Sequence, residues 1–174
     1  MNQVAWAMPA LAEEVLMSRA PLIAPERWDR GPVLDHDEVM RRLPHREQAL
    51  LIDRVTHVDR ERDEVVAVHD LGRHHAVFAG HFPGHPVFPA VLQAEAIAQA
   101  GAMSQGVEPG EVWLMSHILG ARFFRAVGPE AGIRLLARVI SDGWFDVVVG
   151  QCWQEGQLCS AAAIAGLRST QKGS

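Results

Sequence analysis

The stretch AGHFPGHPVFPAVLQAEAIAQAGAMS, residues 79–104, decides the fold. It starts as a stiff loop, because three prolines stand within seven positions and each fixes φ and restricts the residue before it. From Pro89 to about Gln105 it reads as an Ala-rich helix that is apolar on nearly every side, which is typical of a buried helix. Pro89 suits the first turn, where its missing N–H has no intrahelical acceptor. The rest of the chain is therefore expected to pack around this helix.

Glu95 is the only ionisable residue of the predicted helix. A charge among Ala94, Ala96 and Ile97 is costly unless it is paired or neutralised, so this carboxyl needs a reason to be there. Gln99 lies one turn later on the same face, where its amide can orient the carboxyl. Desolvation is expected to raise the pKa of Glu95. The ordinary alternatives are a solvated helical Glu and, for His81 in the preceding loop, a structural role; the apolar neighbours argue against the first.

The composition limits the classes of protein to which this chain can belong. With 174 residues, 48% apolar and 21% charged, the chain fits one globular domain. A net charge of −5 gives no support for nucleic-acid binding. The sequence contains neither an apolar run long enough for a transmembrane helix nor a signal-peptide pattern, so we expect no membrane partner and a cytoplasmic location.

Two cysteines, Cys152 and Cys159, stand symmetrically about Glu155-Gly156. They can face each other across a hairpin, but without secretory signals two reduced, packed thiols are expected.

Residues 1–34 form an N-terminal arm, with a short helix at 10–19 and a Pro-rich linker at 21–34. The arm covers an apolar patch, contacts a partner subunit or is disordered. Four large apolar residues favour the first two alternatives: Trp6, Leu11, Leu16 and Trp28.

The remaining elements predict an α+β fold. A short helix opens at Asp35 and ends near Leu43-Pro44, and residues 72–78 are expected to be irregular. Strands are expected at 49–60, 64–71, 111–125, 132–141, 144–154 and 157–168, with two-residue hairpins at 142–143 and 155–156 and a disordered tail at 169–174. An antiparallel sheet rolled around the long central helix buries all of these apolar faces.

Three stretches carry a family resemblance: LPHREQALLIDRV (43–55), GHFPGHPVFPAVLQAEAIAQ (80–99) and GARFFRAVGP (120–129). In order and spacing they resemble the FabZ-type (3R)-hydroxyacyl-[acyl-carrier-protein] dehydratases, over roughly residues 36–168. The resemblance implies a hotdog fold in a domain spanning 35–168. It also implies dehydration of a 3-hydroxyacyl thioester on an acyl carrier protein to the trans-2-enoyl thioester, in fatty-acid or related polyketide or polyene biosynthesis, without a cofactor.

The resemblance also implies an active site. His81 and Glu95 would be catalytic and would come from opposite subunits of a homodimer, alone or in a trimer of dimers. The backbone N–H of Ala90, where the family usually has glycine, would contact the thioester carbonyl, and Gln99 would support Glu95. The related isomerising FabA branch usually has Asp at the position of Glu95, so Glu favours simple dehydration.

The acyl chain would lie in an apolar tunnel, for which plain core packing is an equal alternative for each wall residue. The candidates are Phe82, Val87, Phe88, Leu92, Phe123 and Phe124. Arg122 and Arg125 match basic positions of the family and would dock the acidic carrier protein, unless they are simply solvated. Ala90, the absence of tyrosine, the N-terminal arm and Pro129-Glu130-Ala131 depart from the family and favour a specialised pathway.

Other functions stay open. A hotdog thioesterase would direct a hydrolytic water with the helix carboxylate, and a non-catalytic relative would act only in a heterodimer. Four histidines invite a metal site, His74, His75, His81 and His85, but no HExxH motif anchors it and no metal is expected. His45, in the LPHR element, is expected to stabilise the fold near the first domain helix.

Overall fold

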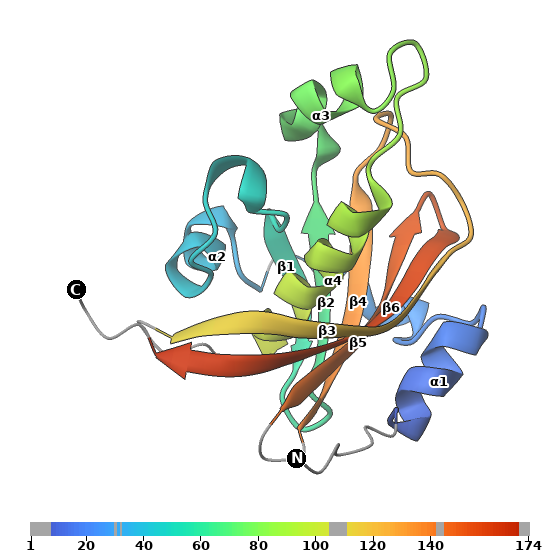
Figure 1. Ribbon diagram of the computed structural model, residues 1–174. Coiled ribbons are helices and arrows are strands. Elements are labelled where there is room, and N and C mark those ends of the chain that lie inside the picture. Colours follow the sequence, from blue (N-terminus) through green and yellow to red (C-terminus); the bar gives the residue numbers. More distant parts are fainter. Residues whose placement is uncertain (1–7, 30, 32, 105–110, 142–144, 171–174) are drawn as a thin grey trace, which may run out of the picture.

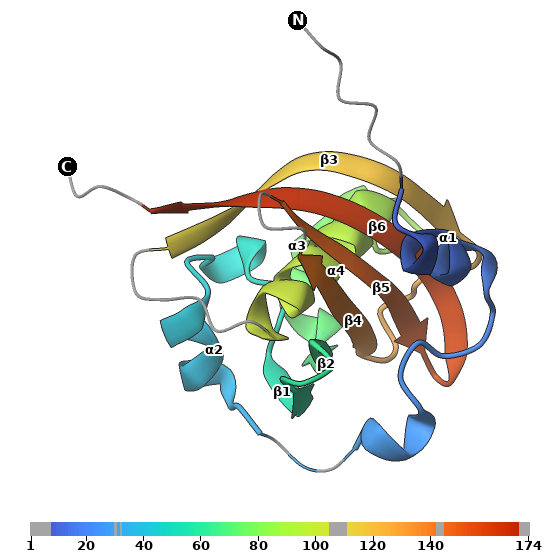
Figure 2. The ribbon, with the colours of Figure 1, turned by 90° about the horizontal axis from the view of Figure 1, so that it is seen from below.

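The computed structural model describes residues 8–29, 31, 33–104, 111–141 and 145–170. Within these ranges six strands form one antiparallel sheet in the order β1-β2-β4-β5-β6-β3. The sheet curls around the central helix α4 (Figures 1 and 2). This is the predicted α+β hotdog architecture, and that prediction is confirmed. The strands are β1 (Arg54–Asp59), β2 (Glu64–His69), β3 (Glu111–Phe123), β4 (Ile133–Ser141), β5 (Asp146–Gln154) and β6 (Gln157–Thr170), and α4 is Ala90–Ser104.

Two glycines let α4 lie close against the sheet. A Cβ atom on Gly101 would lie 2.5 Å from Val148 Cγ1 of β5, and one on Gly150 would lie 2.5 Å from Ile97 Cγ2 of α4. Carbon atoms do not approach so closely, so a side chain at either position would push the helix off the sheet. The contact buries Ile97 completely, together with most of the alanines of α4. The distance between α4 and the sheet is therefore fixed, and with it the position of Glu95 relative to the sheet.

The N-terminal arm covers the outer face of the sheet. Helix α1 (Ala10–Met17) packs Ala12, Val15 and Leu16 onto the small and branched residues of β5 and β6 (Figure 2). Further along, Trp28 packs against Trp153, with ring centroids 5.4 Å apart. Of the alternatives for the arm, covering an apolar patch is the one that the structure shows for these residues. Trp6 lies outside the described residues.

Polar contacts fasten the same arm to β5. The amide oxygen of Gln151 accepts from the backbone N–H of Leu22 (2.8 Å), and its nitrogen donates to the carbonyl of Ala20 (2.9 Å). Gln151 is wholly buried, so these bonds satisfy an amide that would otherwise be unpaired.

Two predicted elements differ from the structure. Residues 72–78, expected to be irregular, lie in the helical turn η3 (Leu71–His74) and in α3 (His75–Gly80), because Phe78 buries its ring beside Phe88 with centroids 6.0 Å apart. The first strand begins at Arg54 and not at 49, because residues 47–49 form the 3₁₀ turn η2 (Glu47–Ala49). The Gln99 side chain donates to the carbonyl of Ala49, the last residue of that turn, accepts from the N–H of Leu51 just after it, and so holds the turn against α4.

Other boundaries agree with the sequence. Helix α2 (His36–Arg42) is capped by Asp35, whose carboxylate accepts from the N–H of Glu38. Glu155 and Gly156 have φ of 49° and 73°, the values of a tight hairpin turn. The other predicted hairpin, 142–143, lies outside the described residues, and so does Gln105, the predicted end of the central helix. Strand β6 runs to Thr170, two residues beyond the predicted limit.

Cys152 and Cys159 are both free and buried, as expected of packed thiols. Burial raises the pKa of each, which keeps both in the unreactive thiol form. None of the helices in the described ranges is long and apolar enough to cross a membrane.

Candidate active site

The His81 loop holds its imidazole in one tautomer. His81 Nδ1 lies 2.7 Å from the carbonyl oxygen of Val87, and the N–H of Val87 donates back to the carbonyl of His81. A carbonyl oxygen only accepts, so Nδ1 carries the hydrogen. In the neutral ring Nε2 then keeps its lone pair and can accept a proton. The Phe82 ring stacks on the imidazole at 4.1 Å between centroids and holds its plane.

A pocket joins His81 to the start of α4. Its lining residues are His81, Val87, Phe88, Ala90, Gln93, Phe123, Phe124, Arg125 and Ala126. Ala90 is the first residue of α4, so its N–H belongs to the group that no intrahelical carbonyl reaches. The pocket therefore places a hydrogen-bond donor and a base on one short apolar surface.

The tunnel candidates separate into two sets. Val87, Phe88, Phe123 and Phe124 line the His81 pocket. Phe82 instead stacks on His81 and is 53% exposed, and Leu92 packs against the main core. Phe124 also lies beneath the guanidinium of Arg19, 3.7 Å from its ring centroid, so the N-terminal arm reaches this wall.

Glu95 is held from two sides. Its Oε1 accepts from Gln99 Nε2 at 3.0 Å, the contact that their spacing predicts, and lies 3.5 Å from His45 Nε2. Gln99 in turn donates to the carbonyl of Ala49 and accepts from the N–H of Leu51. Its amide thus ties the helix carboxylate to the chain segment that precedes β1.

The expected rise in the pKa of Glu95 is wrong. The hydrogen bond with His45 lowers the pKa of Glu95 below its usual value of 4.5, the bond from Gln99 lowers it further, and together they outweigh desolvation. The side chain is also 34% exposed, so it keeps contact with water. Glu95 is therefore ionised at neutral pH in the single chain.

His45 contacts Glu95, whereas the sequence predicts for it only a role in the stability of the fold. The signal was its place in the LPHR element, one of the three stretches that carry the resemblance. The pocket around Glu95 is lined by Leu43, Pro44, His45, Glu95, Ala98, Gln99, Ala102, Trp113, Leu114 and Met115. It shares no residue with the His81 pocket, so one chain does not bring His81 and Glu95 into the same pocket.

Replacing His45 with alanine is expected to raise the pKa of Glu95. The substitution removes the largest influence that lowers this pKa and leaves desolvation in place. A carbon-13 NMR titration of the Glu95 carboxyl measures the shift directly. His36→Ala removes a histidine beside Asp53 and serves as the matched control, with no change at Glu95. An unchanged titration of Glu95 in the His45 variant would show that His45 does not act on this carboxyl.

Only two of the four histidines considered as a metal site, His81 and His85, have described side chains. The side chains of His74 and His75 lie outside the described part of the chain, and His81 is engaged with Val87. A different group, His57, Asp59 and Glu64, has ligand atoms within 4.8 Å of one another. Its carboxylates are already paired with arginines: Asp59 with Arg62, and Glu64 with Arg27 and Arg138. This group is therefore better described as a salt-bridge network.

The comparisons with known proteins place the chain first by fold and then by family. The dehydratase heterocomplex ApeI:P from Xenorhabdus doucetiae superposes with a TM-score of 0.57 at 17% identity, covering 76% of this chain and 91% of that one, which establishes the hotdog fold alone. The family model for the FabA-like domain matches residues 43–159.

Curated relatives agree with that match. A 3-hydroxyacyl-[acyl-carrier-protein] dehydratase FabZ of Symbiobacterium thermophilum is 44% identical over 105 residues, which are 59% of this chain and 73% of the relative. The FabZ of Shewanella denitrificans is 36% identical over 148 residues, or 80% of this chain and 95% of the relative. The chain therefore belongs to the FabZ-type dehydratase family, as its three motif stretches indicate.

Proposed function

We propose that this protein dehydrates (3R)-hydroxyacyl thioesters on an acyl carrier protein to trans-2-enoyl thioesters in fatty-acid biosynthesis. The observation that carries this function is that a chain of the FabZ family has both a histidine whose Nε2 can accept a proton and a helix carboxylate fourteen residues later. A location in the cytoplasm, where acyl carrier proteins supply the substrate, belongs to the same proposal.

His81 acts as the base. Its Nε2 takes a proton from C2 of the substrate, and the hydrogen bond from Nδ1 to Val87 keeps the ring oriented and stabilises the imidazolium that forms. Negative charge then develops on the thioester oxygen. The Ala90 N–H at the start of α4 is the donor that faces this charge, because helix N-terminal amides stabilise anions.

Glu95 acts as an anion. With its pKa lowered by His45 and Gln99, the Glu95 carboxylate holds a water that supplies the proton for the departing hydroxyl. The C3–O bond breaks, the departing oxygen takes a proton from this water, and the hydroxide left behind takes the proton that His81 removed from C2. The net change is the loss of one water from the substrate. Gln99 and His45 keep the carboxylate oriented for this role.

The complete site is shared between two chains. Strand β3 stands at the edge of the sheet, and among the described strands it pairs with β6 alone. Its exposed apolar residues include Leu114 (55%), Ile118 (53%) and Phe123 (49%). An apolar edge of thirteen residues favours pairing with a second chain. Strand β3 lines both the Glu95 pocket and the His81 pocket. A homodimer formed through this edge would therefore bring the Glu95 pocket of one chain against the His81 pocket of the other. The homodimer would exist alone or as part of a trimer of dimers.

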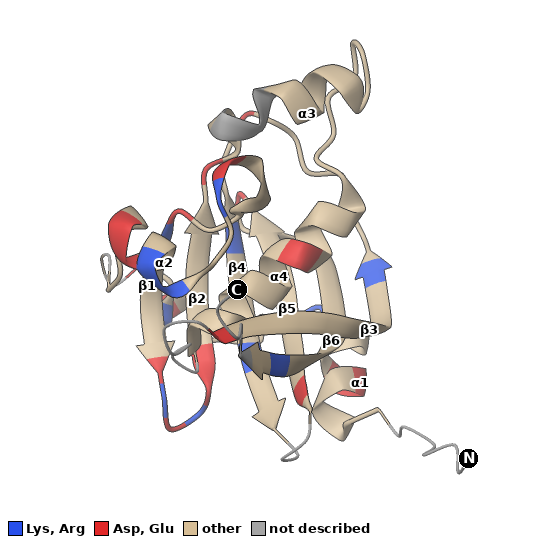
Figure 3. Ribbon diagram, turned by 60° about the vertical axis from the view of Figure 1, so that its left-hand side comes forward, with Lys and Arg blue, Asp and Glu red and all other residues tan. Residues whose placement is uncertain are grey.

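Arg122 and Arg125 form the docking surface for the acidic carrier protein. Arg122 lies at the basic end of β3, the blue arrowhead in Figure 3, and Arg125 lines the His81 pocket while its guanidinium donates to Gln157. Both are exposed beside the expected entrance, where opposite charge accelerates encounter.

Reversing both charges, Arg122→Glu with Arg125→Glu, is expected to raise KM for carrier-protein substrates roughly tenfold or more, because like charges then oppose docking. Turnover of a short pantetheine thioester should change much less. Arg60→Glu, in the distant turn between β1 and β2, is the matched control. If KM rises equally for both kinds of substrate, these arginines act on the site and not on docking.

Mass spectrometry of 3-hydroxyacyl carrier proteins after incubation with the protein tests the function. The expected result is a product lighter by one water with the thioester intact. Free carrier thiol without enoyl product would instead identify a thioesterase. No reaction alone, with reaction after addition of a second hotdog chain, would identify a heterodimer partner. Testing polyketide and polyene intermediates alongside fatty acyl chains would reveal the specialised pathway that Ala90 and the N-terminal arm favour.

A further inference from the structure

The N-terminal arm places one cation beside the His81 pocket. The guanidinium of Arg19 lies over the Phe124 ring, 3.7 Å from its centroid, and Phe124 lines that pocket. A guanidinium that lies over a ring keeps the N–H donors at its edge available for two parallel bonds to a carboxylate or a phosphate. Arg19 is exposed, so a partner can reach these donors. The arm therefore presents an oriented cation next to the pocket.

The backbone around Arg19 is fixed on both sides. Before it, Leu16 of α1 meets β3 at Gly120, where a Cβ atom would lie 2.7 Å from Leu16 Cδ1; Figure 2 shows the two elements side by side. After it, the carbonyl of Ala20 accepts from the side chain of Gln151 on β5 at 2.9 Å. Because this backbone is already ordered, little further freedom is lost when the side chain binds a partner.

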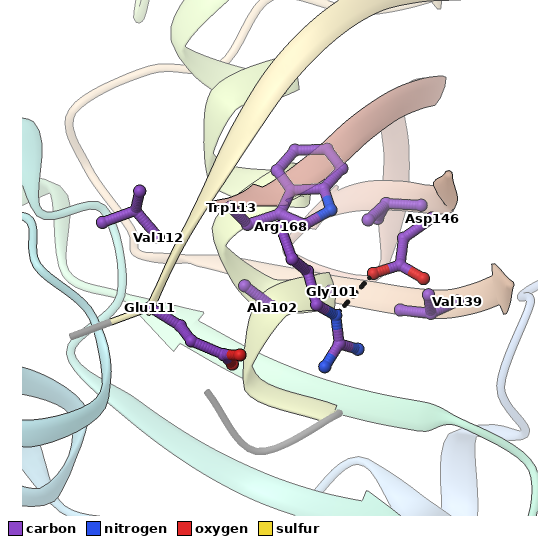
Figure 4. A pocket seen from close by; sticks show the side chains of 9 residues that line it. Gly101, Ala102, Glu111, Val112, Trp113, Val139, Asp146 and Arg168 are labelled. Atoms are coloured by element: carbon purple, nitrogen blue, oxygen red, sulfur yellow. Dashed lines mark hydrogen bonds and ion pairs between the residues drawn. The ribbon is translucent and has the colours of Figure 1, made fainter. Parts of the chain in front are cut away.

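The charge of Arg19 is not neutralised by its own chain. Within the described ranges no carboxylate lies within ion-pair distance of Arg19, Arg122 or Arg125, although the whole chain has a net charge of −5. Arginines elsewhere on the sheet are paired, such as Arg168, whose Nε lies 2.9 Å from Asp146 Oδ2 (Figure 4). Positive charge without a partner beside the His81 pocket favours an acidic partner from outside the chain.

We propose that Arg19 makes the N-terminal arm part of the carrier-protein docking surface, by binding a carboxylate of the acidic carrier protein beside Arg122 and Arg125. The inference rests on the proposed function, which supplies the carrier protein as the partner. Arg19 lies outside the family match, which begins at residue 43, so the contact belongs to the arm and not to the matched domain. It adds selectivity for one carrier protein without touching the reacting groups.

The test compares wild type with Arg19→Met and Arg19→Glu. Methionine keeps an apolar contact with the Phe124 ring and removes the charge, whereas glutamate reverses it. KM for 3-hydroxyacyl carrier proteins is expected to rise roughly threefold in the first variant and roughly tenfold in the second, with kcat unchanged. Both increases should shrink as added salt screens the charges. Arg60→Met removes an exposed arginine beside β1, at the opposite edge of the sheet from β3, and should leave KM unchanged.

Two smaller substrates identify the anion that Arg19 binds. A pantetheine thioester carries neither phosphate nor protein, and a phosphopantetheine thioester adds the phosphate alone. KM for both should be the same in wild type and in the Arg19 variants. An increase for the phosphopantetheine thioester as large as that for the carrier-protein substrate would mean that Arg19 binds the phosphate, and the proposal would be wrong. An increase for the pantetheine thioester would also contradict it, because Arg19 would then act on the pocket.

Fluorescence anisotropy with a labelled holo carrier protein measures docking without turnover. Thermal unfolding shows that each variant is folded, and Arg19→Lys, which keeps the charge, should bind close to wild type. Weaker binding in Arg19→Met and Arg19→Glu supports the docking role even if wild type dehydrates no chain, a result that would refute the proposed function alone. Equal binding by wild type and either folded variant, or no binding by wild type, would refute the docking role.

Discussion

Replacing His81 with alanine is expected to lower kcat/KM about 10³-fold, because a positioned general base contributes roughly 10² to 10⁴ in rate. The ring is held through Nδ1 by the Val87 carbonyl, and no described side chain in its pocket offers another imidazole to replace Nε2. Steady-state kinetics with a 3-hydroxyacyl carrier protein measures the loss.

His85→Ala is the control for this substitution. His85 is exposed in the same loop, and its backbone alone exchanges hydrogen bonds with Phe82, so its side chain is dispensable for the loop. This variant should keep activity close to wild type. A folded His81 variant, of unchanged subunit mass and melting temperature, that turns over like wild type would remove His81 from the mechanism.

Mixing two inactive variants is expected to restore activity. His81→Ala supplies an intact Glu95, and Glu95→Gln supplies an intact His81. If each site takes one residue from each chain, a mixed dimer has one complete site and one site that lacks both groups. Random reassortment of equal amounts makes half of the dimers mixed, so about a quarter of the wild-type activity should return.

Kinetics after co-refolding the two variants measures this recovery. The same proteins combined without unfolding provide the baseline, since their subunits have not exchanged. Should the co-refolded mixture stay at that baseline while native mass spectrometry finds mixed dimers, both residues would have to act from one chain, and the shared site would be wrong.

The fold could be predicted because its signals are local. The Ala-rich run after Pro89, the alternation of the later strands and the turn at Glu155-Gly156 each specify one element without reference to the others. The misread segments depend on distant partners. Residues 47–49 turn away from a strand where Gln99 binds the backbone beyond them, and α3 forms where Phe78 meets Phe88.

The difference between local and long-range contacts also explains which features of the site could be predicted. The spacing of Glu95 and Gln99 is a property of one helix, so their contact was predictable. The pKa of Glu95 was not, because its direction is set by His45, fifty residues earlier in the chain, and a sequence pattern shows burial more readily than the partner that offsets it. The Glu95 pocket is lined by α4 and by β3, and only the folded chain brings Ala102 and Trp113 to the same pocket.

The N-terminal arm is part of the folded domain, although it lies outside the family match. The family match begins at residue 43, yet α1 covers a cluster of buried apolar residues on β5 and β6. The side-chain amide of Gln151 also forms its hydrogen bonds with the backbone of Ala20 and Leu22. A chain shortened to residues 43–159 would expose this apolar cluster to water and leave the buried amide of Gln151 without its hydrogen-bond partners. The segment from α1 to Leu22 is therefore expected to be needed for the solubility of the folded chain.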